Sequence, residues 1–250
     1  MRRYVVFLVV LVMFLVFFVP TCSGQWSGNY SLDLKNRYFG TTVCGIFADE
    51  PVVQQDLDIT RAFRGGRTAL TVSIWNSNGF ENAPDTFAYE TDLDVNVTHK
   101  FGKYTVSAGD WIFFLTPVAG TNVNVISAKI SRTITKGNNA FVPFAAIEHY
   151  DVTTLTSMGH GGNYPMIGTG WTGKLAKRFS IAAQAHANYD VNGGFNNGKG
   201  KALFYSEASL TFAVNESTTL TLPRFGVGGG IGDKGRPSKT VWGIGISKSF

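Results

Sequence analysis

The sequence predicts an all-β fold, a closed antiparallel transmembrane β-barrel, and three observations lead to it. Segments of about ten residues alternate apolar and polar side chains, as strands with one lipid face and one polar face do. Short turns alternate with longer connections along the chain. Only 16% of the residues are charged while 14% are aromatic, so a surface wetted on all sides is not expected.

The alternation is clearest in segment 87–101, where Leu93 and Val95 share one face and Asp92 and Asp94 share the other. Successive side chains of a strand point to opposite faces, so this segment has an apolar and an acidic side. About twelve strands are expected, at 26–39, 52–63, 67–77, 86–101, 103–116, 122–135, 140–151, 165–176, 178–190, 201–214, 218–226 and 238–250. Segments 104–116 and 141–151 are too apolar to assign their faces.

The connections alternate in length. Short turns are expected at 64–66, 101–103, 136–139, 176–177 and 215–217. Longer polar or glycine-rich loops are expected at 40–51, 78–85, 117–121, 152–164, 191–200 and 227–237. Outer-membrane barrels have short periplasmic turns and longer extracellular loops. An N-terminus in the periplasm places every connection on the expected side, which favours a barrel over a secreted β-sandwich and predicts location in the bacterial outer membrane.

The first segment is expected to lie outside the fold. A basic start, an apolar run from Tyr4 to Val19 and small residues near Gly24 are typical of a secretory signal peptide. A retained membrane anchor is the alternative, although the run is shorter than the ~20 residues a spanning helix needs. We therefore expect residues 1–24 to be a signal peptide and residues 25–250 to form a single barrel domain.

The last strand ends in an aromatic residue. Its apolar face resembles the sorting signal of bacterial outer-membrane proteins, although Lys248 departs from that pattern. The expected signal residues are Trp242, Ile244, Ile246 and Phe250. The resemblance implies the barrel-assembly machinery as a partner, with outer-membrane lipids and lipopolysaccharide around the barrel. The net charge of +5 is too mild to favour nucleic acid.

Three stretches carry a further resemblance: Asn36–Gly40, Pro51–Leu57 and Ser73–Asn78. Together they look like the opening of TorF-type porins, with an Arg-aromatic-Gly, then a Pro-x-x-Gln, then a Trp-x-Ser-Asn. The match covers roughly residues 26–80, and the chain has no counterpart to the family's aromatic-rich middle beyond 111–114 with Pro117. The resemblance implies a small porin and transfers no catalytic residue.

In a barrel of this kind the polar faces point into the lumen. The residues expected to line it, of mixed charge, are Asp33, Lys35, Arg37, Asp56, Asp58, Glu90, Asp92, Asp94, Lys129, Lys174, His186 and Glu207. The carboxylates of 52–63 and 86–101 should form one wall, with basic side chains elsewhere around the lumen. Such a split would create a transverse field that favours small polar or zwitterionic solutes.

The sequence offers little for catalysis or metal binding. The four histidines lack metal-ligand spacing, so we expect no metal and no cofactor. An outer-face lipid hydrolase would need a hydroxyl activated by a histidine such as His99 or His149, and no serine-rich motif frames either, so an enzyme is not expected. After cleavage Cys44 has no partner within the chain and is expected to be a free thiol, with intermolecular pairing as the alternative.

Three functions follow from these expectations. The first is a porin-like channel for passive diffusion of small hydrophilic solutes. The second is a non-conducting structural or adhesive barrel whose inner charges pair with one another. The third is the lipid hydrolase. Twelve strands lie between the eight of a barrel filled by side chains and the sixteen or more of an aqueous channel, so any pore should be narrow.

Overall fold

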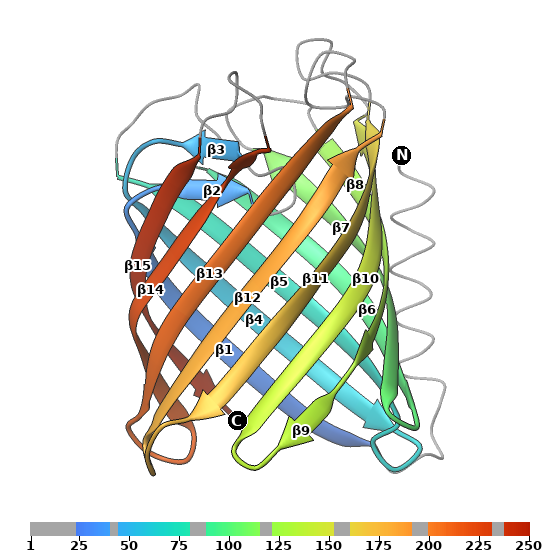
Figure 1. The fold of residues 1–250 in the computed structure, drawn as a ribbon, viewed down its shortest axis with the longest axis vertical. Helices are drawn as coiled ribbons and strands as arrows, with labels where there is room; N and C mark the ends of the chain where they lie inside the picture. The colour runs from blue at the N-terminus through green and yellow to red at the C-terminus, as the bar shows by residue number, and fades with distance from the viewer. Residues whose placement is uncertain are drawn as a thin grey trace.

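In the computed structural model, consecutive strands pair antiparallel in chain order and the sheet closes into a barrel (Figure 1). The structure describes residues 24–40, 45–80, 89–115, 122–152, 161–191, 200–231 and 238–250. The predicted signal peptide, apart from Gly24, and Cys44 lie outside these residues. Within them, no helix is long and apolar enough to cross a membrane.

The barrel strands match the predicted segments closely. They are β1 (Gln25–Lys35), β4 (Val52–Phe63), β5 (Thr68–Gly79), β6 (Glu90–Phe101), β7 (Tyr104–Leu115), β8 (Asn122–Arg132), β9 (Ile134–Lys136), β10 (Asn139–Val152), β11 (Gly162–Lys174), β12 (Phe179–Asp190), β13 (Lys201–Ala213), β14 (Thr218–Gly230) and β15 (Lys239–Ser249). Since β9 continues β8 after Thr133 and pairs with the same strand, β10, the barrel has twelve strands across the described residues.

The first and last strands close the barrel. β1 pairs antiparallel with β15 from Asn29 opposite Ser249 to Lys35 opposite Gly243. Beyond the ladder, Gly28 N donates to Phe250 O at 2.8 Å and Phe250 N donates to Gly28 O at 3.0 Å. Across the described residues the closed ladder leaves no edge of the barrel sheet unpaired, which a strand structure in lipid requires. The closure confirms the barrel and excludes the sandwich.

The two ends of the barrel differ, as the connection lengths predict (Figure 1). We call them the turn end, where the short connections lie, and the loop end. At the turn end Gly102 and Gly137 have φ values of 59° and 56°, a region that glycine enters without steric cost. Gly65 and Gly66, after Phe63, also have positive φ. These glycines allow antiparallel strands to reverse in very few residues.

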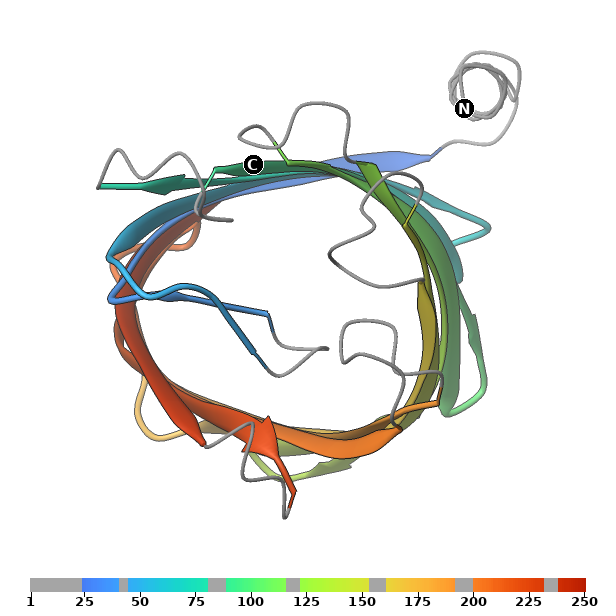
Figure 2. The same cartoon turned by 90° about the horizontal axis from the view of Figure 1, so that it is seen from above.

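The first strand was expected to extend over 26–39, and its predicted C-terminal end is wrong. β1 stops at Lys35, and Tyr38–Gly40 forms a separate strand, β2, that pairs with β3 (Gly45–Ala48). Viewed down the barrel, this hairpin lies inside the ring of strands (Figure 2). The side chain of Asn36 accepts a hydrogen bond from Trp242 N at 2.8 Å, beside the point where the chain leaves the wall. Tyr38 and Phe39 therefore do not belong to the lipid face.

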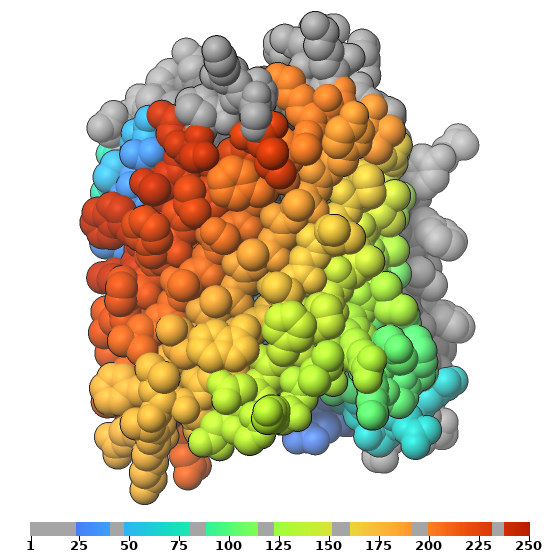
Figure 3. Space-filling model, in the orientation of Figure 1, coloured from blue at the N-terminus to red at the C-terminus, as the bar shows by residue number. Residues whose placement is uncertain are grey.

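The wall is continuous on the side drawn in Figure 3, and many large apolar side chains are exposed on the outer face. Exposed residues on this face include Ile74, Ile126, Ile167 and Ile244. Aromatic side chains gather at the turn end, where Phe101 stacks on Tyr104, Phe179 packs against Phe212, and Arg61 lies over Trp26. Aromatic girdles with nearby cations mark the lipid–water boundary of such barrels.

The predicted sorting residues lie together on this outer face of the last strand. Trp242, Ile244, Ile246 and Phe250 are all exposed, and Phe250 is 66% exposed. Their shared face follows from the alternation of side chains along β15. The position agrees with a signal read by another protein, although recognition itself stays a prediction.

Candidate functional site in the barrel interior

The inner face of the barrel is the face that the β2–β3 hairpin contacts. The pairing register places eleven of the twelve predicted lumen residues on this face: Asp33, Lys35, Asp56, Asp58, Glu90, Asp92, Asp94, Lys129, Lys174, His186 and Glu207. Arg37 is different, because it lies between β1 and β2 rather than on a barrel strand. Its Nη2 pairs with Asp49 Oδ1 at 3.2 Å, so it belongs to the hairpin region and not to the wall.

Four aspartates form an acidic wall on β4 and β6, which flank β5. In one row Asp56 and Asp92 face Trp75 from either side, and in the next row Asp58 and Asp94 face Ser73. Ser73 Oγ donates to Asp58 Oδ1 at 2.5 Å. One buried oxygen of each of Asp56, Asp92 and Asp94 has no hydrogen-bond partner among the residues described. We use "acidic wall" below for these four aspartates.

No described cation lies within ion-pair distance of the acidic wall, since the arginine pairs lie elsewhere. Lys129 Nζ, on β8, lies 4.2 Å from the ring centroid of Phe144 and four strands round the barrel from β4. Lys174 is at the turn-end terminus of β11. The basic residues are therefore spread around the barrel and do not form one opposing wall.

Tyr38 anchors the hairpin to the acidic side of the barrel. Its Oη donates to Glu90 Oε2 at 3.0 Å, and its ring centroid lies 5.4 Å from that of Trp75. Tyr38 is 8% exposed and Glu90 is 2% exposed. Burial first, and then the Glu90 and Asp92 carboxylates, raise the pKa of Tyr38 well above its usual value near 10, so the phenol stays protonated and can donate.

Phe39 anchors the same hairpin to the opposite side. Its ring stacks on Tyr205 of β13 at a centroid distance of 5.5 Å. Tyr205 Oη in turn donates to Glu207 Oε2 at 2.7 Å. Because successive residues of a strand face opposite sides, Tyr38 reaches β6 while Phe39 reaches β13. The hairpin thus crosses the loop end of the interior and divides it.

Arg224 is the centre of a second charged group, below the hairpin. Its Nη1 lies 2.8 Å from Asp33 Oδ2, and its Nε lies 3.6 Å from Glu207 Oε1. Arg224 points inward because the register of β14 shifts between Thr221 and Arg224, across Pro223. Proline cannot donate to the ladder, so a bulge there is expected. A cavity of about 310 Å³ lies beside Arg224.

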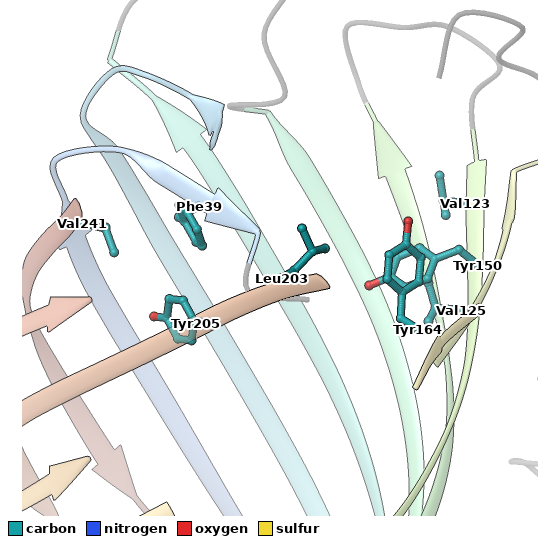
Figure 4. Packing of buried hydrophobic residues seen from close by; sticks show 8 residues of the cluster. All are labelled: Phe39, Val123, Val125, Tyr150, Tyr164, Leu203, Tyr205 and Val241. Carbon is teal, nitrogen blue, oxygen red and sulfur yellow. The ribbon is translucent and has the colours of Figure 1, made fainter. Parts of the chain in front are cut away.

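The inner face is not polar along its whole length, a feature that the sequence did not predict. An apolar cluster occupies its loop end, made of Phe39, Val123, Val125, Tyr150, Tyr164, Leu203, Tyr205 and Val241 (Figure 4). Trp111 and Phe113 pack against it, and the rings of Tyr150 and Tyr164 meet edge to face at 5.1 Å. These rings come from the two segments whose faces the sequence left unassigned and from β11 and β13. Interior aromatics interrupt the alternation and hide the phase of the strand.

Two histidines on the outer face have partners that resemble parts of a hydrolytic site. His99 Nδ1 lies 2.9 Å from Thr68 Oγ1, and His149 Nδ1 lies 2.9 Å from Asn163 Oδ1. The first pair has a hydroxyl and no orienting acid or amide among the described contacts. The second pair has an orienting amide and no hydroxyl there. A nucleophilic triad needs all three groups in sequence, and the described contacts complete it for neither histidine.

The metal prediction can be examined only over part of the chain. In the described residues no three histidine, cysteine, aspartate or glutamate side chains are grouped so that they could hold a metal ion. The acidic wall is spread along two strands separated by β5, which explains why its carboxylates do not converge.

Comparisons with known proteins bear on the fold. No family model and no curated protein matches the chain. Among solved structures, a NanC porin is 15% identical with a TM-score of 0.55, and the match covers 88% of this chain and 98% of that one. A bacterial polysaccharide outer-membrane secretin is 7% identical with a TM-score of 0.57, covering 90% and 98%. A KdgM porin is 12% identical with a TM-score of 0.50, covering 90% and 99%.

These likenesses extend over nearly the whole of both chains, at identities that carry the fold alone. The resemblance to TorF-type porins is not confirmed by them. A closed twelve-strand wall, an apolar exterior with an aromatic girdle and porin-like neighbours agree with one another. The chain is a β-barrel of the bacterial outer-membrane type.

Proposed function

We propose that this barrel is an outer-membrane channel for passive diffusion of small hydrophilic solutes, and that the acidic wall makes it prefer cations over anions. The observation that carries the proposal is the state of the acidic wall. Its aspartates face the interior, and among the described residues no basic side chain neutralises them. Buried charges without partners are costly in a closed protein interior, whereas water and mobile ions in a pore stabilise them.

The geometry also limits what can pass. A twelve-strand barrel is narrower than the sixteen-strand porins, and the β2–β3 hairpin occupies part of the loop end. Tyr38 and Phe39 hold the hairpin against two opposite parts of the wall. The channel we propose is therefore narrow, with the hairpin beside its constriction and the acidic wall toward the turn end.

A second candidate, a non-conducting structural barrel, is favoured by one specific observation. The apolar cluster at the loop end buries Val125, Tyr164 and Leu203 completely on the inner face. A lumen sealed there would conduct nothing, and the barrel would then serve adhesion or membrane structure. Conductance separates the two candidates directly.

The test is single-channel recording of the refolded protein in planar bilayers, with a KCl gradient to give the cation/anion permeability ratio. We expect discrete cation-preferring openings. Replacing Asp58 and Asp94 together by Asn should shift the permeability ratio toward chloride by about two- to threefold, because two charges facing a narrow pore change its potential.

Asp151→Asn is the matched control, since Asp151 lies on the outer face of β10 and is exposed. It should leave the permeability ratio unchanged. Absence of conductance in well-folded wild-type protein would reject the channel in favour of the structural barrel. Conductance whose selectivity is indifferent to D58N/D94N would reject the assignment of the acidic wall as the selectivity element.

The remaining partners stay proposals as well. The outward face of β15, with Trp242 and Phe250, supports recognition by the barrel-assembly machinery, and the apolar exterior supports contact with outer-membrane lipids and lipopolysaccharide.

A further inference from the structure

We propose that the cavity beside Arg224 is a binding site for the carboxylate of a small anionic solute, with Lys35 as its principal ligand. The inference rests on the proposed function in one respect, because the solute is taken to reach the site through the channel. The cavity of about 310 Å³ is lined by Lys35, Phe39, Gln184, Tyr205, Glu207 and Arg224, among others. Its volume lies near the lower end of the range for small-molecule sites, roughly 300–1,000 Å³.

Two glycines lie in the barrel wall near the cavity. On the inner face of β15, a Cβ on Gly243 would come within 2.9 Å of Lys35 Cγ. A Cβ on Gly226 of β14 would come within 3.0 Å of Tyr205 Oη. The side chains of Lys35 and Tyr205 therefore lie directly against the backbone of these glycines. The missing side chains leave room for the long side chain of Lys35 and for the cavity beside it.

The hydrogen-bonding capacity of the lining is unbalanced. Glu207 Oε2 accepts a hydrogen bond from Tyr205, whereas Oε1 lies 3.6 Å from Arg224 Nε, at ion-pair distance without a hydrogen bond. Asp33 Oδ2 accepts from Arg224. Among the residues described, Lys35 Nζ has no hydrogen bond and no carboxylate within 4.0 Å, although it lies in the field of Asp33 and Glu207. The lining therefore offers two donors without hydrogen-bond partners among the residues described, Lys35 Nζ and Arg224 Nε, beside carboxylate oxygens of Glu207 and Asp33 that already accept.

An anion with two oxygens on one carbon suits these donors. An ammonium and a guanidinium are the side chains that bind carboxylates through charge-assisted hydrogen bonds. The amide of Gln184 and the ring of Tyr205 supply a polar group and an apolar face for the rest of the molecule. The lining holds two basic residues, Lys35 and Arg224, and one acidic residue, Glu207, while Asp33 pairs with Arg224 from outside the lining. The positive charge left for a ligand is therefore that of Lys35, which fits a monocarboxylate better than a polyanion.

The acidic wall gives this site a selective role. Lys35 belongs to β1, next to β4, yet it lies four residues along the wall from Asp56, because Lys35 pairs with Val52. Lys35 therefore offers a monocarboxylate an attractive position on the loop-end side of the acidic wall. The cavity is thus a place in the described interior where an acidic solute can bind.

The test is calorimetric titration of the refolded wild-type protein in detergent with gluconate, and with sorbitol as a neutral polyol of the same carbon number. We expect heat from gluconate binding and none from sorbitol. Lys35→Met, which keeps most of the stem and removes the charge, should weaken gluconate binding about tenfold, and Lys35→Arg should restore most of it. The matched control is Lys129→Met, an inner-face cation outside the cavity, which should leave gluconate affinity unchanged.

Salt provides a measurement that needs no variant. Affinity for gluconate should fall as KCl rises, because an ion pair open to water is screened. Equal binding of gluconate and sorbitol, equal losses in K35M and K129M, or an affinity indifferent to KCl would each overturn the site. No gluconate binding in a protein that conducts KCl overturns the site alone, while gluconate binding in a protein that conducts nothing overturns the proposed channel and leaves the site standing.

Discussion

Replacing Tyr38 by Phe removes one oxygen and should loosen the β2–β3 hairpin without changing the barrel. The oxygen lost is the donor of a 3.0 Å hydrogen bond to Glu90, whose side chain is almost completely buried. A buried acceptor that loses its partner costs about 1–3 kcal/mol. If the hairpin opens as a local unit, that cost lowers its opening free energy directly, which increases the open population by roughly 5- to 150-fold.

Hydrogen exchange followed by mass spectrometry measures this change at the hairpin. Amides of β2 (Tyr38–Gly40) and β3 (Gly45–Ala48) should exchange faster in Y38F by that factor, while amides in the middle of β12 should be unaffected. Glu90→Gln is the conservative comparison, because an amide oxygen can still accept from the phenol, and its effect should be smaller. Unchanged hairpin exchange in Y38F, or equal acceleration in the barrel strands, would refute the idea that this hydrogen bond holds an independent hairpin.

Two further predictions concern the same hairpin. Gly228→Val should displace it and change single-channel conductance, because a Cβ there would lie 2.5 Å from Phe39 Cζ, whereas Gly170→Val, with its nearest atom 4.0 Å away, should leave conductance unchanged; equal effects of the two would contradict the role of Phe39. Raising the pH above about 10 should also loosen the hairpin. The pKa of Tyr38 is raised in the folded state, so its stabilisation is complete below the unfolded value and is lost as the pH rises toward the folded one. The acceleration of exchange at alkaline pH, after correction for the intrinsic rate, should be absent from Y38F.

Most of the barrel could be predicted because its strands repeat one simple pattern. Segment 52–63 was predicted with the bounds that β4 has, and 179–190 of β12 lay within one residue of the prediction. In both strands, apolar and polar side chains alternate, so the sequence alone shows which side chains face the lipid and which face the interior. The acidic wall followed for the same reason, since Asp92 and Asp94 alternate with Leu93 and Val95.

The hairpin could not be predicted, because its residues satisfy the strand pattern as well. Tyr38 falls in phase with Leu32 and Leu34, and local alternation alone extends β1 to it. The contacts that hold the hairpin inside the barrel are made with residues distant in the sequence. Glu90, the partner of Tyr38, lies 52 residues away, and Tyr205, the partner of Phe39, lies farther still. No signal within the segment reports contacts with partners on distant strands. The Asn36-Arg37 pair is the only local hint, since polar residues there leave room for a turn.

Near the C-terminus, a glycine-rich stretch predicts a loop where the structure has a strand. The cavity beside this strand could therefore not be predicted. The sequence predicts a loop from residue 227 onward, yet the run from Gly226 to Gly230 is the last part of β14. A glycine-rich strand is weak on its own account, and it is found where another group must approach the backbone closely. Here Phe39 lies against Gly228 and Tyr205 against Gly226. The hairpin, the glycines of β14 and the cavity are thus parts of one arrangement: Phe39 and Tyr205 lie against wall positions that carry no side chain, and both also line the cavity beside Arg224.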